Sequence, residues 1–184
     1  MKHKGTQSLE SHRLILRKFK LEDTDMMYQN WSRDEQVTKF LTWPTHKNVQ
    51  ETHSLLEYWI SEYIEPETYR WCISLKDNKE PIGSISVVSF NPKVDSLEIG
   101  YCIGRDYWNQ GFTTEAVQTV VDFLFSQVSI NRIEAYVDPR NIGSGSVLVK
   151  SSFRYTGLRR QVAVNNMGIC DVITYEILKE DYIN

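Results

Sequence analysis

A short polar turn leads directly into an amphipathic helix in the middle of the chain, where residues 108–117 read WNQGFTTEAV. The first N–H groups of a helix have no intrahelical partner, and the helix N-terminus carries about half a positive charge. Gly111 allows close approach to the backbone, and Thr113 and Thr114 add hydroxyl donors. Each hydrogen bond to a charged group contributes roughly 1.5–3 kcal/mol, so a few would hold a pyrophosphate. The residues leave two interpretations open, an anion site or an ordinary capped helix.

Two residues shortly before this turn carry groups that can do chemistry. Glu98 lies in a predicted strand between Leu97 and Ile99, where partial burial would raise the pKa of its carboxyl group toward that of a general base. A carboxylate that faces solvent, or that bonds to a neighbouring strand, fits the same position. Cys102 has no paired histidine and no helix start beside it to lower its thiol pKa, so we expect a small buried side chain there.

The elements that position these residues follow from hydrophobic periodicity and turn signals. Runs rich in β-branched and aromatic residues predict strands at 13–19, 69–75, 82–90, 97–103, 132–137, 153–164 and 170–178. Apolar residues at helical spacing predict helices at 21–31, 49–64, 112–125 and 144–151. Polar turns between the three strands of 69–103 indicate an antiparallel meander. The order β-α-α-β-β-β-α-β-α-β-β predicts an α/β (α+β) fold, a mixed sheet with helices on both faces.

Composition narrows the class of protein. At 184 residues, with 41% hydrophobic and 24% charged residues, the chain predicts a single globular domain over 1–184. A net charge of −3 argues against a nucleic-acid partner, and no apolar run is long enough to span a membrane. Three scattered cysteines and four scattered histidines match no metal-ligand spacing, so we expect no metal. Reduced thiols and the absence of a secretory pattern favour a cytoplasmic protein.

Neighbouring residues favour the anion site over an ordinary capped helix. The chain resembles the GNAT superfamily of N-acetyltransferases, most closely the branch that acetylates the N-termini of ribosomal proteins. The resemblance runs through RLILR at 13–17, the Trp43-Pro44 region, LEIGYCIGRDYWNQGFTTEAV at 97–117, NRIEAYVDPRN at 131–141 and SVLVKSSF at 146–153. It implies an acetyl-CoA site and a mostly antiparallel sheet splayed between its fourth and fifth strands.

The resemblance also implies which residues hold the coenzyme. The pyrophosphate would lie on the backbone of one loop, formed by Asn109, Gln110, Gly111, Phe112, Thr113 and Thr114. The strand end formed by Tyr101, Cys102 and Ile103 would pair with the pantetheine amides, and the Ile103 N–H would polarise the thioester carbonyl. Gly100 is the expected place for a bulge beside the splay.

Residues after the next strand complete the implied site. Asn141 matches the family asparagine that bonds the pantetheine arm, and Lys150 would approach the outer phosphate or remain a solvated helix lysine. Ser144 matches a serine of the ribosomal-protein branch that would protonate the leaving thiolate, although it is also a good helix N-cap. The usual family tyrosine is replaced by Leu148.

The family pattern has departures around the turn. Trp108 stands where glutamine or arginine is usual, Asn109 and Ser152 stand where glycine is usual, and Thr113 replaces a small residue. Backbone donors do not depend on side-chain identity, so these changes leave the implied site in place.

The spacing of Glu98 to Gly111 resembles that of the strand glutamate that serves as base in histone-type relatives, while direct attack with proton loss through water stays open. Trp43 is the expected acceptor contact, because Pro44 stiffens the loop beside its large ring. The amine acceptor stays open between a protein N-terminal α-amino group and a small amine such as a polyamine or an antibiotic. A non-enzymatic acyl-CoA-binding or sensing module is the alternative to an enzyme, and a homodimer is also left open.

Overall fold

The computed structural model describes residues 2–183 of the chain. The strands are β1 (Leu9–Glu10), β2 (Leu14–Arg17), β3 (Arg70–Leu75), β4 (Pro81–Asn91), β5 (Ser96–Ile103), β6 (Arg132–Val137), β7 (Arg154–Asn165) and β8 (Gly168–Leu178). The α-helices are α1 (Thr24–Met27), α2 (Glu35–Thr38), α3 (Val49–Ser61), α4 (Phe112–Phe123), α5 (Ile142–Lys150) and α6 (Lys179–Ile183). Short 3₁₀ or π turns adjoin them at η1 (Leu21–Asp23), η2 (Tyr28–Ser32), η3 (Glu62–Ile64), η4 (Arg105–Tyr107) and η5 (Leu124–Val128).

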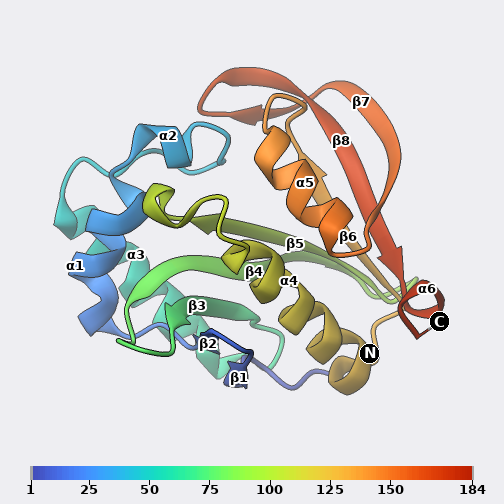
Figure 1. The fold of residues 1–184 in the computed structure, drawn as a ribbon, viewed down its shortest axis with the longest axis horizontal. Helices are drawn as coiled ribbons and strands as arrows, with labels where there is room; N and C mark the ends of the chain where they lie inside the picture. Colours follow the sequence, from blue (N-terminus) through green and yellow to red (C-terminus); the bar gives the residue numbers. More distant parts are fainter. Residues whose placement is uncertain (1, 184) are drawn as a thin grey trace.

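The strands form a mixed sheet in the order β1-β2-β3-β4-β5-β6-β8-β7. Neighbouring strands run antiparallel except β5 and β6, which are parallel. The parallel pairing covers only Ser96–Glu98 of β5 against Arg132–Glu134 of β6, although both strands continue for several residues. The two strands therefore separate after Glu98, as Figure 1 shows. The predicted splay between the 97–103 and 132–137 strands is confirmed.

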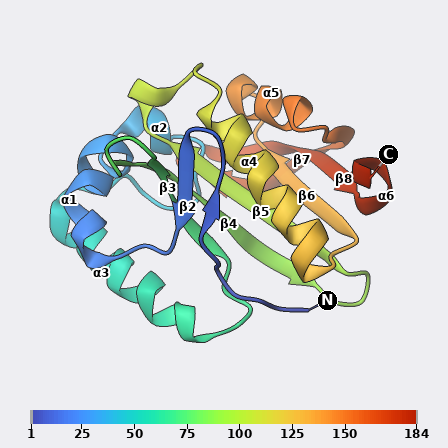
Figure 2. The same ribbon diagram turned by 60° about the horizontal axis from the view of Figure 1, so that its bottom comes forward.

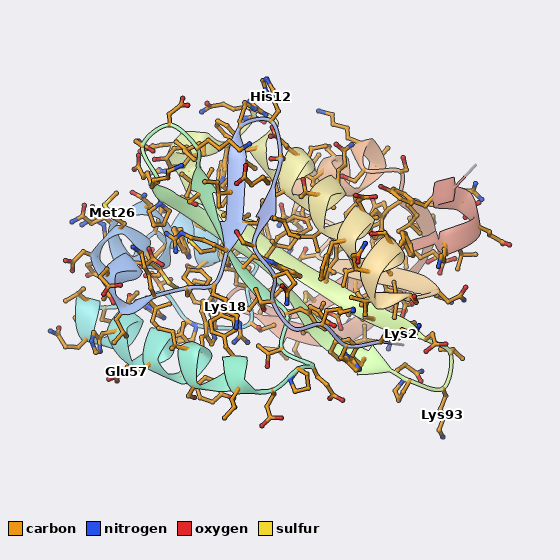
Figure 3. The ribbon with its side chains drawn as sticks, turned by 90° about the horizontal axis from the view of Figure 1, so that it is seen from below. Lys2, His12, Lys18, Met26, Glu57 and Lys93 are labelled. Carbon is orange, nitrogen blue, oxygen red and sulfur yellow. The ribbon has the colours of Figure 1, made fainter. Side chains whose placement is uncertain are left out.

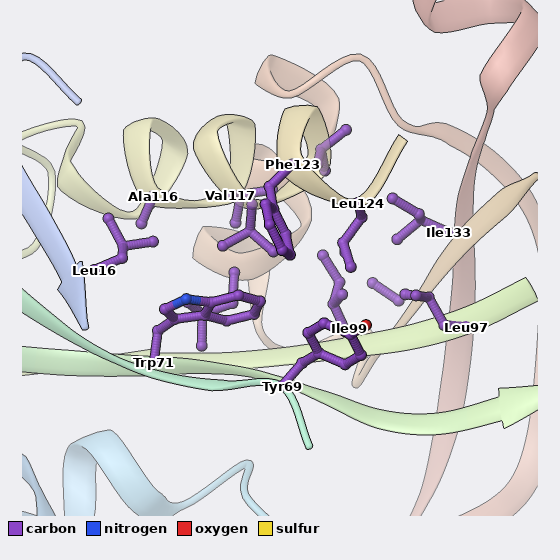
Figure 4. Close-up of a cluster of buried hydrophobic side chains, with 14 of the residues drawn as sticks. Leu16, Tyr69, Trp71, Leu97, Ile99, Ala116, Val117, Phe123, Leu124 and Ile133 are labelled. Atoms are coloured by element: carbon purple, nitrogen blue, oxygen red, sulfur yellow. The ribbon is translucent and has the colours of Figure 1, made fainter. Parts of the chain in front are cut away.

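Helix α4 covers one face of the sheet at this point. Its buried stripe of Ala116, Val117, Val120 and Val121 packs on strand residues that include Leu97 and Ile99 (Figure 4). Complete burial of each valine contributes about 1.5–3 kcal/mol, and the stripe recurs at helical spacing. The position of α4 over β5, and hence of the turn that precedes α4, is fixed by this packing.

The other face of the sheet carries the N-terminal helices. Met27, Trp31 and Leu56 are fully buried against Cys72 of β3 and Cys102 of β5. Successive side chains of a strand point to opposite faces, so Glu98 and Cys102 share this face while their odd-numbered neighbours point toward α4. Glu98 therefore lies on the side of the sheet opposite the phosphate-binding candidate.

A long hairpin of β7 and β8 crosses toward the N-terminal half of the chain (Figure 1). At its tip, Asn166 donates from its side chain to the carbonyl oxygens of Thr38 at 2.9 Å and Trp43 at 2.8 Å. Its backbone N–H donates to Leu41 O at 3.2 Å. The hairpin tip and the loop after α2 are thereby joined.

Local details differ from the sequence-based expectations. The helix expected at 21–31 is a succession of 3₁₀, α and π turns, and α2 and α6 were not expected. The expected bulge at Gly100 is wrong: the register shift lies in β4, between Val87 and Ser89. Gly100 pairs regularly with Ser86, and a Cβ placed on it would lie 3.0 Å from Val88 Cγ2. The glycine makes room for the bulge on the neighbouring strand.

Candidate coenzyme and acceptor site

The turn before α4 has the backbone conformation of an anion-binding loop. Asn109 and Gly111 have positive φ angles of 59° and 79°, and Gly111 is the N-cap of α4. Glycine has no side chain with which to cap the helix, so the N–H groups of Phe112, Thr113 and Thr114 receive no side-chain cap there. Alternation of left- and right-handed residues directs successive N–H groups to one point. Within residues 2–183, neither threonine hydroxyl makes a hydrogen bond.

Side chains in the turn and just before it hold the turn in place. Tyr107 donates its hydroxyl to Glu80 Oε1 at 2.7 Å, and Trp108 donates its indole N–H to Ile103 O at 2.9 Å. The Gln110 amide donates to Asp106 O at 2.7 Å. Trp108, which departs from the family pattern, thus links the turn to the end of β5.

The backbone of β5 faces the splay at alternate residues. Gly104 N–H bonds to Ile82 O at 2.8 Å, so in an antiparallel ladder Cys102 also bonds to β4. The N–H and C=O groups of Tyr101 and Ile103 then point the other way, toward β6. Because the β5–β6 pairing ends at Glu98, the Tyr101 groups and the Ile103 N–H are available to an added strand, whereas the Ile103 carbonyl already accepts from the Trp108 indole. This geometry favours Tyr101 and Ile103 over Cys102 for main-chain contacts with a pantetheine arm.

Glu98 occupies the last paired position before the splay. Ser89 Oγ donates to Glu98 Oε2 at 3.0 Å, and Glu134 lies opposite on β6. Burial raises the pKa of Glu98 and the charge of Glu134 adds to the rise, while the Ser89 hydrogen bond opposes it. Arg132 pairs with Glu134 at 2.7 Å and also with Glu176, so its single positive charge is shared between these two carboxylates. Glu98, Glu134 and Glu176 form a row of carboxylates across β5, β6 and β8. Within the described residues, Glu98 is the member of this row that forms no ion pair.

The start of α5 corrects one expectation. Asn141, and not Ser144, is the N-cap of this helix, and its Oδ1 accepts from Ser144 N at 3.2 Å. The Ser144 hydroxyl donates to the Tyr101 hydroxyl at 3.0 Å, and Tyr101 in turn donates to Ser144 O at 3.0 Å. Burial raises the pKa of Tyr101, so this phenol stays neutral at ordinary pH. The structure joins Ser144 and Asn141 to β5 on the α4 side of the splay.

Lys150 and Cys102 lie in different surroundings. Lys150 is exposed at the end of α5, where its carbonyl oxygen accepts from Gln118 of α4 at 3.1 Å. It lines a cavity of about 400 Å³ together with Asn141 and Tyr175. Burial raises the pKa of the Cys102 thiol to about 11, which makes the thiolate scarce at neutral pH. This agrees with the expected small buried side chain.

Trp43 lies on the Glu98 side of the sheet. Its ring packs against the cluster around Trp31 and stands 5.3 Å from the ring of His46. Burial lowers the pKa of His46, and its Nδ1 lies 2.7 Å from Thr52 Oγ1. The Trp43 loop is anchored on this side by α3 and on the other by Asn166.

The residues present fit a coenzyme with a diphosphate and an extended amide arm. The turn offers main-chain donors at the start of a helix of 12 residues, and the splay offers strand-like main-chain groups. Among the described residues, no three His, Cys, Asp or Glu side chains gather as a metal site, and no helix is long and apolar enough to cross a membrane.

The turn before α4 and the gap between β5 and β6 together suit a phosphorylated donor with an extended arm. Residues 13–154 match the family model described as "Acetyltransferase (GNAT) domain", and the chain belongs to this family of acetyltransferases.

Relatives agree over nearly the whole chain. An uncharacterized N-acetyltransferase of Bacillus licheniformis, p20, is 34% identical over 96% of this chain and 98% of its own. A GNAT-family acetyltransferase from Bacillus anthracis superposes with a TM-score of 0.83 at 22% identity, covering 95% of this chain and 99% of its own. RimL, a ribosomal L7/L12 α-N-protein acetyltransferase in complex with coenzyme A, gives 0.82 at 19%, covering 94% and 98%. The expected fold and family are confirmed.

Several residues of the site were not found from the sequence. Ser89 bonds to Glu98, and Tyr136 of β6, which is 42% exposed, lies close enough for Glu134 and Glu98 to raise its pKa beside the larger effect of burial. Asn166 lies more than 100 residues from the loop it binds. Arg13, which the sequence placed at the start of a strand and in the RLILR run without a role in the site, contacts the turn before α4. No local pattern marks contacts between such distant segments.

Proposed function

We propose that this protein is an acetyl-CoA-dependent N-acetyltransferase that acts on a primary amine, by direct transfer between two substrates bound together. The observation that carries the proposal is the glycine turn at the start of α4, placed beside the point where β5 and β6 separate. Acetyl-CoA would supply an acetyl group activated as a thioester. The sequence relative and the family model support this reaction class.

The donor half of the site is built mainly from main-chain groups. The N–H groups of Gly111, Phe112, Thr113 and Thr114 would hold the diphosphate, with the turn residues Asn109 and Gln110 shaping the loop. Tyr101 and Ile103 would pair with the pantetheine amides, and the Ile103 N–H would also face the carbonyl oxygen. Cys102, Asn141 and Lys150 remain expected contacts of the coenzyme.

Proton handling falls to Glu98 and Ser144. Glu98 would accept a proton from the incoming ammonium, because its carboxyl group lies on the acceptor side and burial raises its pKa. Ser144 would donate to the leaving sulfur after its hydroxyl turns away from Tyr101. Leu148 fills the usual tyrosine position with an apolar side chain, so it has no part in this step.

The acceptor would enter between the Trp43 loop and the β7–β8 hairpin. Asn166 ties these two segments together, and Tyr136 and Glu98 lie on the same side of the sheet. We favour a protein N-terminal α-amino group. An α-amino group has a pKa near 7.7–8.0, so roughly a quarter is already neutral at pH 7.4 and a single weak base suffices. The structural likeness to RimL supports this choice, while small amines remain the competing acceptor class.

A direct assay separates these possibilities. The purified protein is mixed with acetyl-CoA and matched acceptors, namely short peptides with a free or a blocked N-terminus, free lysine side chains and polyamines, and thiol release is followed. We expect turnover with the peptides that have a free N-terminus and little with blocked ones. Calorimetric binding of coenzyme A without turnover on any acceptor would favour the non-enzymatic module. Failure to bind coenzyme A would refute the proposal.

A further inference from the structure

The residues that flank the β1–β2 turn reach the proposed phosphate loop from a distant part of the chain. Figure 2 shows β1 and β2 lying beside α4. Arg13 Nη1 donates to Gln110 O at 2.9 Å, and Arg13 Nε donates to Glu115 Oε2 at 2.7 Å. The guanidinium carbon stands 4.3 Å from the centre of the Phe112 ring. A Cβ placed on Gly111 would lie 3.4 Å from Arg13 Nη2. One side chain therefore contacts the loop on both sides of its glycine.

The Gln110 contact fixes a donor on the opposite side of the same peptide. In a trans peptide the C=O of one residue and the N–H of the next point in opposite directions. The bond from Arg13 holds the Gln110 carbonyl against the body of the protein, so the Gly111 N–H points away from Arg13. Glycine turns are conformationally permissive, and without this bond the Gln110–Gly111 peptide could rotate and present its carbonyl oxygen to an anion.

Glu115 gives the same arginine a second role. Its carboxylate lies in the first turn of α4, where it would repel a bound diphosphate. It accepts from Ser11 Oγ, from Arg13 N and from Arg13 Nε, each at 2.7 Å. Burial alone would raise the pKa of Glu115, but the hydrogen bonds from Arg13 and Ser11 outweigh burial and lower it, so the group is ionised. The positive charge of Arg13 cancels the negative charge that the loop would otherwise face.

We infer that Arg13 is a specificity-determining positioning residue for the diphosphate of the acyl donor. It orients the Gln110–Gly111 peptide and neutralises Glu115, so that the loop selects donors that carry a diphosphate over shorter thioesters with the same acyl arm. This inference rests on the proposed function of the loop. Arg13 itself acts through Gln110 and Glu115.

The test compares two donors that differ only beyond the pantetheine. Arg13→Met keeps the aliphatic stem over Phe112 but removes the donors and the charge, and Arg13→Lys keeps the charge without the forked geometry. We expect Arg13→Met to lower kcat/KM for acetyl-CoA and the affinity for coenzyme A about tenfold or more, as for the loss of one charge-assisted hydrogen bond. With S-acetyl-pantetheine, which has no diphosphate, kcat/KM should change less than about threefold. Arg13→Lys should lie between the wild type and Arg13→Met.

His12 provides the matched control, because it is exposed in the same turn and points outward (Figure 3). His12→Ala should leave both donors unaffected. In a Glu115→Gln background, Arg13→Met should cost less than in the wild type, because there is no charge left to cancel. Equal losses with both donors, or no loss with either, would overturn the inference, and if Arg13→Met does not fold the same comparison is made with Arg13→Lys. A wild-type protein that binds no coenzyme A would instead overturn the proposed function.

Discussion

Glu98→Gln is the substitution that tests the proposed base most directly. Glutamine keeps the length of the side chain and an oxygen that can accept the Ser89 hydrogen bond, but it cannot take a proton from an ammonium group. A positioned general base contributes about 10²–10⁴ in rate. We therefore expect kcat to fall by about that factor, which corresponds to about 3–5 kcal/mol in the activation free energy. The KM for acetyl-CoA should change little, since Glu98 lies on the face of the sheet opposite α4, where we propose that the acceptor binds.

The size of the loss should depend on the acceptor. At pH 7.4, roughly 0.1% of a lysine side chain is neutral, against roughly a quarter of an α-amino group. The variant should thus be more impaired with lysine-like amines than with peptide N-termini. A pH profile of kcat/KM for the wild type should fall as the pH drops through the raised pKa of Glu98, and the variant should lose this acidic limb.

Stability should move in the opposite direction to activity. Burial, helped by Glu134, raises the pKa of Glu98 in the folded protein above its unfolded value. A carboxyl group of this kind destabilises the fold where it is ionised, above its folded pKa, and the penalty disappears as the pH falls below the unfolded pKa. Glu98→Gln should therefore have a Tm at neutral pH no lower than that of the wild type.

The assay follows thiol release at saturating acetyl-CoA, with Glu176→Gln as the control. Glu176 belongs to the same row of carboxylates but is paired with Arg132, one strand farther from the splay. The control should keep turnover within about threefold of the wild type, because it leaves the base intact. The reasoning about Glu98 is refuted if Glu98→Gln keeps more than about a third of the wild-type turnover with both acceptor classes.

Three further outcomes follow from the geometry. Gly111→Ala places a Cβ on a residue with a φ of 79°, which costs about 1–2 kcal/mol. Calorimetry should therefore show an affinity for coenzyme A that is reduced about tenfold. The control Gly157→Ala adds its Cβ in open space and should have no effect on this affinity. Asn166→Ala removes two side-chain bonds to the loop after α2, and steady-state kinetics should show a higher KM for the amine with an unchanged KM for acetyl-CoA. Cys102, with its pKa of about 11, should resist alkylation at pH 8 in the folded protein, as read by mass spectrometry; rapid labelling there would contradict its burial.

Much of the fold was predictable because its signals are local. Side chains from Leu97 to Ile103 point alternately to the two faces of the sheet, and the helix after Gly111 repeats its apolar residues at helical spacing. Both elements and their order therefore follow from the sequence. Short elements escaped: α2, with four residues, and α6, with five, are too brief for a periodic signal. The bulge escaped because the extra residue, Val88, is a β-branched residue within a run typical of a strand.

The geometry of the candidate site was predictable where it depends on the main chain and less so where it depends on side chains. The glycine turn was found because glycine is the residue that its backbone requires. The choice between Asn141 and Ser144 as N-cap could not be made, since both are good capping residues and only three positions apart. The hydrogen bond from Arg13 to Gln110 joins residues 97 positions apart, and no local sequence pattern in either segment predicts this contact.

The hydrogen bonds between the tip of the β7–β8 hairpin and the loop after α2 have a consequence for how the acceptor preference of this protein can change during evolution. In the proposed site, main-chain groups would hold the donor, whereas the amine would contact side chains of two segments that are remote in the sequence. Mutations in those segments should change which amine is preferred without changing the binding of the coenzyme. Exchange of the 158–170 segment between homologues, together with residues 38–45, should transplant acceptor preference as a unit, since each half is held in shape by the other.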